Sequence, residues 1–292
     1  MTLPAVTLIP ESDVTDERVR EAFRDIKNAL RVPIVNAVFQ AYAAVPKFLD
    51  LAWRRLRPSI LTAQFGLEAA KINRLAESGT SGWSIGDHAA LLRARNIGNA
   101  DLRMMRQIVE LFAVVNAKLL ILTNAVDAAL SGATVGGAGT SGPVHNDDRE
   151  RNLKEFRGVR LHIVDERDAP PRVRSIYDEI KQAFALPFVP NDYRAMAAYP
   201  DWLDIAWKDC RAMFQDLRHK ALEREVEGAG HDAVRTLPHR FSLSQYLLES
   251  NGLNDAERAR LAEINRMFVR ALPRLVISGE VCRRGLGQET VW

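Results

Sequence analysis

One stretch of the chain occurs twice, and this repeat constrains the fold more than any other feature of the sequence. Residues 34–53 read IVNAVFQAYAAVPKFLDLAW, and residues 188–207 read FVPNDYRAMAAYPDWLDIAW. The match extends back to Val19 and Val173 without a gap, and paired positions such as Trp53 and Trp207 lie 154 residues apart. A unit of this length that occurs only twice is not a solenoid, so we predict a duplicated domain.

A weaker second match pairs residues 96–121 with residues 249–277, where the spacing drifts to 156 by Lys118 and Arg274. We therefore predict two helical repeats, residues 1–130 and 153–292, joined by a Gly/Ser-rich linker at 131–152. Two copies of one unit can bury the same face by packing as an internal pseudo-dimer. The active site is then expected between the halves.

The local patterns are helical almost throughout. Residues 19–30 carry apolar side chains at helical spacing among good helix formers. Asn254 followed by Glu257 is a capping-box pattern, and matched prolines such as Pro46 and Pro200 mark helix boundaries in both halves. Only residues 159–164, VRLHIV, resemble a strand, and that run is short. We predict an all-α protein.

Charge and composition limit the classes of function. The formal net charge is only +3 and the basic residues are spread over helical faces, which gives no footprint for nucleic acid. The most apolar long stretch, residues 111–130, includes Asn116, Lys118, Asn124 and Asp127, so it predicts a buried helix and no membrane association. The N-terminus lacks the features of a signal peptide, so a cytoplasmic location is expected.

The metal-ligating residue types form no motif. Cys210 and Cys282 belong to no CxxC pair, and the six histidines form no H-x-x-x-H pattern. The glycine run at 136–142 lacks the lysine and the flanking elements of a phosphate loop. We therefore predict no metal and no phosphate-binding loop.

The two copies differ in chemistry at two places. Asp192 stands where the first copy has Val38, and Asn116 stands where the second copy has Leu272. An aspartate after Pro190 could be a helix cap or a first-turn residue, and a buried asparagine could be a packing hydrogen bond. The functional reading is a general base, Asp192, and an amide that orients water, Asn116. The sequence pattern alone leaves both readings open.

These residues also resemble a known family. The segments LRVP at 30–33, FLDLAWRR at 48–55, NAKLLILT at 116–123 and NDYRAMAAYP at 191–200 occur in the order and spacing of the group I, or DehI-type, 2-haloacid dehalogenases. The resemblance covers most of the chain, including its duplication. It implies an all-helical pseudo-dimer that associates as a homodimer and uses no cofactor.

The resemblance implies hydrolysis of small 2-haloalkanoic acids to 2-hydroxy acids. A carboxylate activates a water, which displaces halide from the α-carbon with inversion and without an ester intermediate. Asp192 matches the family's catalytic aspartate, and Asn116 matches the asparagine that helps to hold the water. The substrate carboxylate is expected to bind backbone amides around residues 190–193.

The pocket departs from the family pattern at several positions. Ile34 replaces a tryptophan, Ala37 a phenylalanine, and Asn265 a tyrosine, while Pro190 and Asn191 replace a small residue and a serine. The family's Thr-x-x-x-Glu pattern keeps Thr62, but Gly66 replaces its glutamate. We expect the substrate pocket to be formed by Ile34, Ala37, Val38, Thr62, Pro190, Asn191, Tyr193 and Asn265.

Two rival functions remain open at this point. The altered pocket is compatible with the same fold acting on a different small 2-substituted acid. A non-catalytic helical interaction protein is the other alternative, with Asp192 as a cap and Asn116 as a buried strut.

Overall fold

The computed structural model describes residues 4–137 and 159–287, and within these ranges the all-α prediction is confirmed. This part contains twelve α-helices and a short 3₁₀ helix, Glu11–Asp13. Residues 159–164 form no strand. The helices before the linker are α1 (Glu17–Leu30), α2 (Ala37–Tyr42), α3 (Pro46–Ile60), α4 (Ala63–Thr80), α5 (His88–Arg93) and α6 (Asn99–Leu130). Those after it are α8 (Pro171–Phe184), α9 (Asn191–Met196), α10 (Pro200–Gln215), α11 (Leu217–Arg235), α12 (Gln245–Ser250) and α13 (Asp255–Gly285).

Helix boundaries recur at positions 154 residues apart. Helices α1 and α8 both end at a non-glycine residue in the left-handed region, Arg31 with φ 58° and Ala185 with φ 51°. Helices α3 and α10 both begin with proline, Pro46 and Pro200, whose fixed φ suits the first helical position. Asn254 and Glu257 form the predicted capping box at the start of α13.

The two matched tryptophans each form a hydrogen bond between two outer helices of their half. Trp53 Nε1 on α3 donates to Asp25 Oδ2 on α1 at 2.7 Å, and Arg57 Nε donates to the same oxygen at 2.6 Å. In the second half, Glu179 Oε2 on α8 accepts from Trp207 Nε1 at 2.8 Å and from Arg211 Nη1 at 3.2 Å, both on α10. The same three-residue arrangement therefore holds α1 against α3 and α8 against α10.

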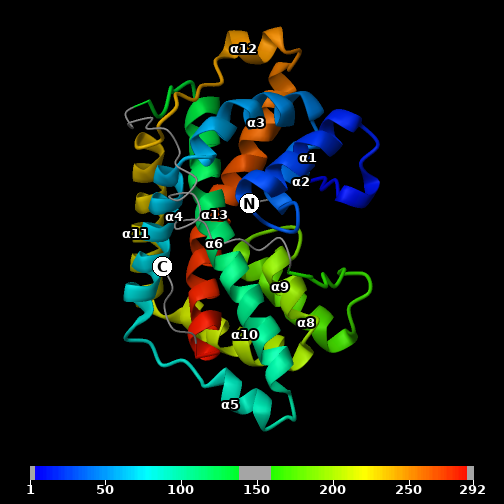
Figure 1. Cartoon of the computed structure of the whole chain (residues 1–292), viewed down its shortest axis with the longest axis vertical. Helices are drawn as coiled ribbons and strands as arrows, with labels where there is room; N and C mark the ends of the chain where they lie inside the picture. The colour runs from blue at the N-terminus through cyan, green and yellow to red at the C-terminus, as the bar shows by residue number, and fades with distance from the viewer. Residues whose placement is uncertain (1–3, 138–158, 288–292) are drawn as a thin grey trace.

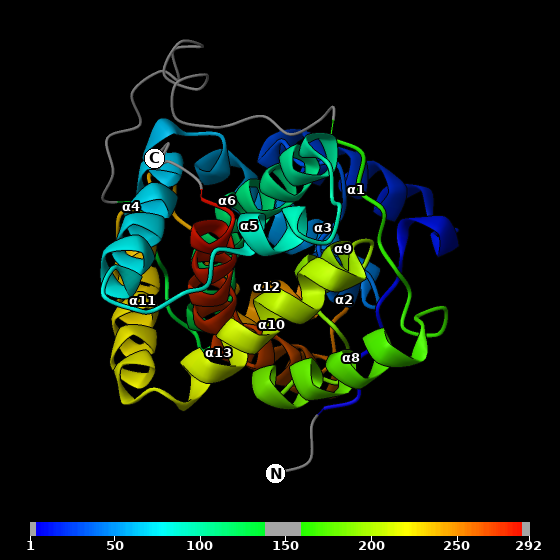
Figure 2. The same cartoon turned by 90° about the horizontal axis from the view of Figure 1, so that it is seen from below.

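The two longest helices, α6 and α13, lie side by side through the middle of the molecule (Figures 1 and 2). Helix α6 is apolar and long enough to cross a membrane, but 94% of its most apolar window is buried inside the protein. This agrees with the prediction of a buried helix. Helices α4 and α11 pack against the central pair, so the polar residues of α6 lie within the core.

Part of the predicted linker contacts the second half. Val135 and Phe241 exchange backbone hydrogen bonds at 2.8 and 2.9 Å, and Gly137 N donates to Leu237 O at 2.8 Å. Gly136 and Gly137 have φ of 72° and 82°, which glycine adopts without the strain of a side chain. Residues 138–152 of the predicted linker lie outside the described residues.

Candidate active site

A cavity lies where the short helices α2 and α9 meet the central pair α6 and α13. We call it the front cavity; its volume is about 30 Å³, which is room for water or a small ligand group. Its walls are mostly apolar, with Asp192, Asn116, Asn36 and Asn191 as the polar side chains. The other residues that line it are Ala37, Val38, Leu119, Leu186, Phe188, Pro190, Phe268, Leu272 and Leu275.

Asp192 enters the front cavity from the first turn of α9. Pro190 directly precedes this helix, and proline has no backbone N–H group to donate. No side chain caps this helix end, so Asp192 does not serve as a helix cap. Asp192 is partly exposed as a residue, while its chain neighbours Asn191 and Tyr193 are buried. Its side chain lines the front cavity, which is where a ligand could meet it.

Asn116 reaches the same carboxylate from the other half of the chain. Its Nδ2 donates to Asp192 Oδ2 at 2.6 Å, and the asparagine side chain is 2% exposed. Asn116 lies in the middle of α6, where its backbone groups are used by the helix. The structure thus brings together the two residues at which the copies differ in chemistry.

The surroundings set the acidity of Asp192. Burial among apolar side chains raises its pKa to about 6, against the opposing effects of the Asn116 hydrogen bond and of its own backbone N–H. A carboxyl group with this pKa is ionised at neutral pH and still basic enough to accept a proton from water. Its chemistry fits that of a general base.

The front cavity is built from equivalent positions of the two repeats. Val38 and Asp192 both line it, and so do Asn116 and Leu272, and Leu119 and Leu275. In the first two of these pairs, each half supplies one polar residue and the other half supplies its aliphatic counterpart. The cavity therefore has lining residues from both halves of the chain, with Asn116 from the first and Asp192 from the second.

The front cavity includes half of the predicted substrate-binding residues. Ala37, Val38, Pro190 and Asn191 line it. The other half of the predicted set does not line the front cavity and lies elsewhere in the protein: Ile34, Thr62, Tyr193 and Asn265.

Three of these residues have a structural role outside the cavity. Thr62 caps α4, accepting from Phe65 N at 3.3 Å. Asn265 is fully buried, where its Oδ1 accepts from Tyr42 Oη at 2.5 Å and its Nδ2 donates to Thr123 O at 3.0 Å. Ile34 is partly buried and packs against the core.

Tyr193 is buried and lines a neighbouring cavity instead. Sequence reasoning missed the aromatic and aliphatic wall, which comprises Leu119, Leu186, Phe188, Phe268, Leu272 and Leu275. Two residues of this wall could have been predicted from the repeat, since Leu272 is the counterpart of Asn116 and Phe188 is the counterpart of Ile34.

The chain resembles known proteins along most of its length. The family model described as "Halocarboxylic acid dehydrogenase DehI" matches residues 33–193 and 187–291. An (R)-2-haloacid dehalogenase from Pseudomonas putida is 28% identical, over 90% of this chain and 87% of its own length. A configuration-inverting 2-haloacid dehalogenase from Alcaligenes xylosoxydans xylosoxydans is 26% identical, over 95% of this chain and 93% of its own length.

The fold also matches solved structures. A D-2-haloacid dehalogenase mutant in complex with D-2-CPA superposes with a TM-score of 0.89 and 24% identity, covering 98% of this chain and 99% of that one. A D-2-haloacid dehalogenase in complex with L-LA gives a TM-score of 0.88, also at 24% identity, with 98% of both chains covered. These similarities show that the chain has the fold of those proteins.

Proposed function

This chain belongs to the DehI family, and on that premise we propose that it is a hydrolase that converts small 2-haloalkanoic acids to 2-hydroxy acids. The observation that carries the proposal is the 2.6 Å hydrogen bond between Asn116 and Asp192 at the wall of the front cavity. The relatives named above are 2-haloacid dehalogenases. A base and a water-orienting amide beside an apolar cavity are the groups that this hydrolysis needs.

The mechanism uses Asp192 as the general base. Its carboxylate takes a proton from a water that Asn116 helps to orient, and the water oxygen forms a bond to the α-carbon. The carbon–halogen bond breaks on the opposite side, the halide leaves with the bonding electrons, and the configuration inverts. Holding the water oxygen in line with the carbon–halogen bond, with the base beside the water, lowers the entropic part of the barrier.

Neutral polar groups are proposed to bind the substrate carboxylate. The front-cavity lining among the described residues contains no lysine or arginine, so the binding groups are amides. We assign this role to the Asn191 side chain and to the first-turn backbone N–H groups of α9. Arg194 Nη1 donates to Asn191 Oδ1 at 3.5 Å, which leaves the amide nitrogen as the donor for the substrate.

The two halves are proposed to be an internal duplication that packs as a pseudo-dimer about the front cavity. The matched helix ends, the matched tryptophan clusters and the paired lining positions support this. The homodimer and the cytoplasmic location stay predictions from the resemblance and the sequence.

The cavity wall favours acids with a larger substituent as a second candidate substrate class. Ala37, which stands where the resemblance places a phenylalanine, lines the front cavity. The missing ring leaves more room beside the α-carbon, so longer 2-haloacids are expected to be accepted as well.

Halide release from D- and L-2-chloropropionate, assayed separately, tests the proposal. We expect release from at least one enantiomer, and at least tenfold slower release from the uncharged 2-chloropropionamide, because the amide lacks the carboxylate that the site binds. The product of each active enantiomer should have the opposite configuration. No release from any 2-haloacid by folded protein contradicts the proposal and favours the non-catalytic alternative.

The pH profile is expected to follow the ionisation of Asp192. Because the pKa of Asp192 is raised to about 6, the base is ionised above that pH and protonated below it. Initial rates of halide release should give a kcat/KM that is level above pH 7 and falls about tenfold per pH unit below 6. A profile that stays level down to pH 4.5 contradicts the assignment of Asp192 as the base.

A further inference from the structure

Asn36 is a polar residue of the front cavity that the proposed mechanism does not use. It directly precedes α2 and lines the cavity together with Asp192 and Asn116. The residue is 4% exposed, and neither Oδ1 nor Nδ2 makes a hydrogen bond within the described residues. Because Oδ1 is also closed off from solvent, Nδ2 is the atom with which this side chain can meet a ligand.

The helix that follows Asn36 does not account for its amide. An asparagine in this position usually caps the helix, its side-chain oxygen accepting from a backbone N–H of the first turn. Asn254 does so at the start of α13, where its Oδ1 accepts from Glu257 N at 2.8 Å. Asn36 has the same extended backbone, but its side chain forms no cap bond. A buried amide without a partner is unfavourable, which indicates another use.

The packing of the short helices separates Asn36 from the base. Helix α9 packs against α6, and these two helices carry Asp192 and Asn116. Helix α2 packs against α13, so these two helices supply the other wall of the front cavity. That wall is apolar apart from Asn36, and its other members are Ala37, Val38, Phe268, Leu272 and Leu275.

The repeat gives this amide to the first half alone. The counterpart of Asn36 is Pro190, which has no side-chain donor. Val38 on the α2 wall is the counterpart of Asp192 on the α9 wall. The base therefore belongs to one wall, and the unpartnered amide belongs to the other.

The geometry of the reaction requires a partner for the halide on the wall away from the base. In an in-line displacement the water attacks from the side of Asp192 and Asn116, and the carbon–halogen bond breaks on the opposite side. Negative charge then develops on the halogen beside the wall of α2 and α13. A fixed N–H donor at that place stabilises the transition state more than the bound substrate.

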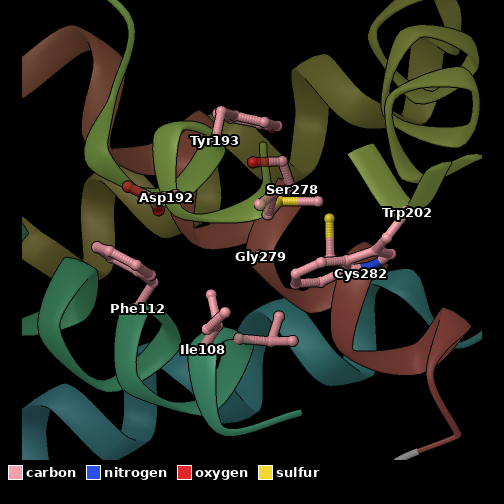
Figure 3. Close-up of a pocket in the computed structure, with 10 residues that line it drawn as sticks. Ile108, Phe112, Asp192, Tyr193, Trp202, Ser278, Gly279 and Cys282 are labelled. Atoms are coloured by element: carbon pink, nitrogen blue, oxygen red, sulfur yellow. The ribbon is translucent and has the colours of Figure 1, made fainter. Parts of the chain in front are cut away.

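A second cavity also borders Asp192, but it does not suit the halide. Its volume is about 20 Å³, and Figure 3 shows Asp192 at one end of it. A halide in this cavity would lie beside the base, whereas the displacement sends it away from the base. Neither Asn36 nor Asn116 lines this second cavity. The front cavity is therefore the place where the halide leaves.

We propose that Asn36 is a catalytic residue whose Nδ2 donates a hydrogen bond to the departing halide. This inference rests on the proposed function. The halide takes the bonding electrons from the α-carbon and accepts this hydrogen bond, while the proton of the attacking water passes to Asp192. The role explains why Asn36 lines the cavity without capping α2.

Asn36→Ala tests the proposal with 2-chloro-, 2-bromo- and 2-iodopropionate. Chloride is the strongest hydrogen-bond acceptor of the three halides and the poorest leaving group, so its departure depends most on the donor. We expect kcat to fall about 10–100-fold for the chloro acid, less for the bromo acid, and no more than about threefold for the iodo acid. KM should stay within about twofold, because the bond forms mainly in the transition state.

Asn254→Ala is the matched control, since Asn254 also precedes a helix but lines neither cavity. It should lower Tm through the lost cap and leave kcat for all three acids within about twofold. Asn36→Ala should leave Tm level, because no cap bond is lost. Asn36→Leu keeps the size of the side chain and removes the donor, so it should reproduce the dependence on the leaving group without adding room to the cavity.

Three results overturn the proposal while the wild type still releases halide, and each leaves the proposed function standing. The first is an unchanged kcat for all three acids in Asn36→Ala and Asn36→Leu. The second is an equal loss of kcat for all three acids, which identifies a structural role. The third is an equal rise in KM with kcat unchanged, which identifies a group that binds the substrate carboxylate.

A crystal soaked in sodium bromide tests the inference if the wild type turns over no 2-haloacid. In that case the proposed function fails. Anomalous bromide density within hydrogen-bond distance of Asn36 Nδ2 still supports the halide site. Bromide density only at other places, or none at all, overturns it.

Discussion

Replacing Asp192 with asparagine is expected to lower halide release by about 10³–10⁴-fold, because an amide cannot take the proton from the attacking water. The two side chains have nearly the same shape, and the Asn116 amide can still donate to the remaining oxygen. The expected loss is therefore in kcat, with KM changed little. Steady-state halide release from 2-chloropropionate measures both parameters.

The same variant should not lose stability. Burial raises the pKa of Asp192 to about 6, so the folded protein holds this proton more tightly than the unfolded chain does. The fold therefore loses stability as the pH rises from about 4 to about 6, by up to about 3 kcal/mol in total. Asparagine removes that charge, so the Tm of the variant at pH 8 should equal or exceed that of the wild type, and the difference should vanish below pH 4.

Asp201→Asn is the matched control, because Asp201 stands in the first turn of α10 and is exposed in its ion pairs with Arg95 and Arg172. It should leave halide release within about twofold. If Asp192→Asn also keeps its activity, Asp192 is only a first-turn residue and the proposed mechanism fails.

Replacing Arg283 with alanine is expected to cause the largest loss of stability, about 3–5 kcal/mol. Arg283 is 2% exposed and binds both oxygens of Glu280, at 2.7 and 2.8 Å, and Glu77 on α4 at 3.3 Å. Without the guanidinium, Glu280 remains as a buried charge. Urea unfolding monitored by circular dichroism measures the loss.

The pH dependence of that loss is a further check. Burial raises the pKa of Glu280, and Arg283 opposes the rise. In Arg283→Ala the pKa of Glu280 should rise further, so the loss should be larger at pH 8 than at pH 5, where protonation removes the buried charge. Arg284→Ala is the control: within the described residues Arg284 donates to the backbone carbonyls of Thr80 and Ser81, and its charge acts on Glu280 more weakly than that of Arg283, so it should cost about 1 kcal/mol. Equal losses in the two variants contradict the buried-charge account.

Helix ends and helix contacts could be predicted from the sequence because the two copies of the repeat can be compared with each other. Paired prolines and tryptophans mark helix ends and helix contacts, and these depend mainly on local geometry. Asp192 and Asn116 could be singled out for the same reason, since a change from aliphatic to polar at a matched core position is costly without a use. Their 2.6 Å contact joins the two differences in one site.

The rest of the site depends on tertiary packing that sequence spacing does not determine. Thr62 and Asn265 were expected in the pocket, but a helix cap and a buried hydrogen-bond pair account for their polar atoms.

A single turnover in water enriched with ¹⁸O, with enzyme in excess over 2-chloropropionate, tests the central claim most directly. Mass spectrometry of the lactate reports which oxygen has entered the product. If Asp192 activates water for direct attack, the new hydroxyl carries ¹⁸O in the first turnover and Asp192 remains unlabelled. Unlabelled product in that turnover means that a carboxylate oxygen of the protein attacked the α-carbon, and it contradicts the account.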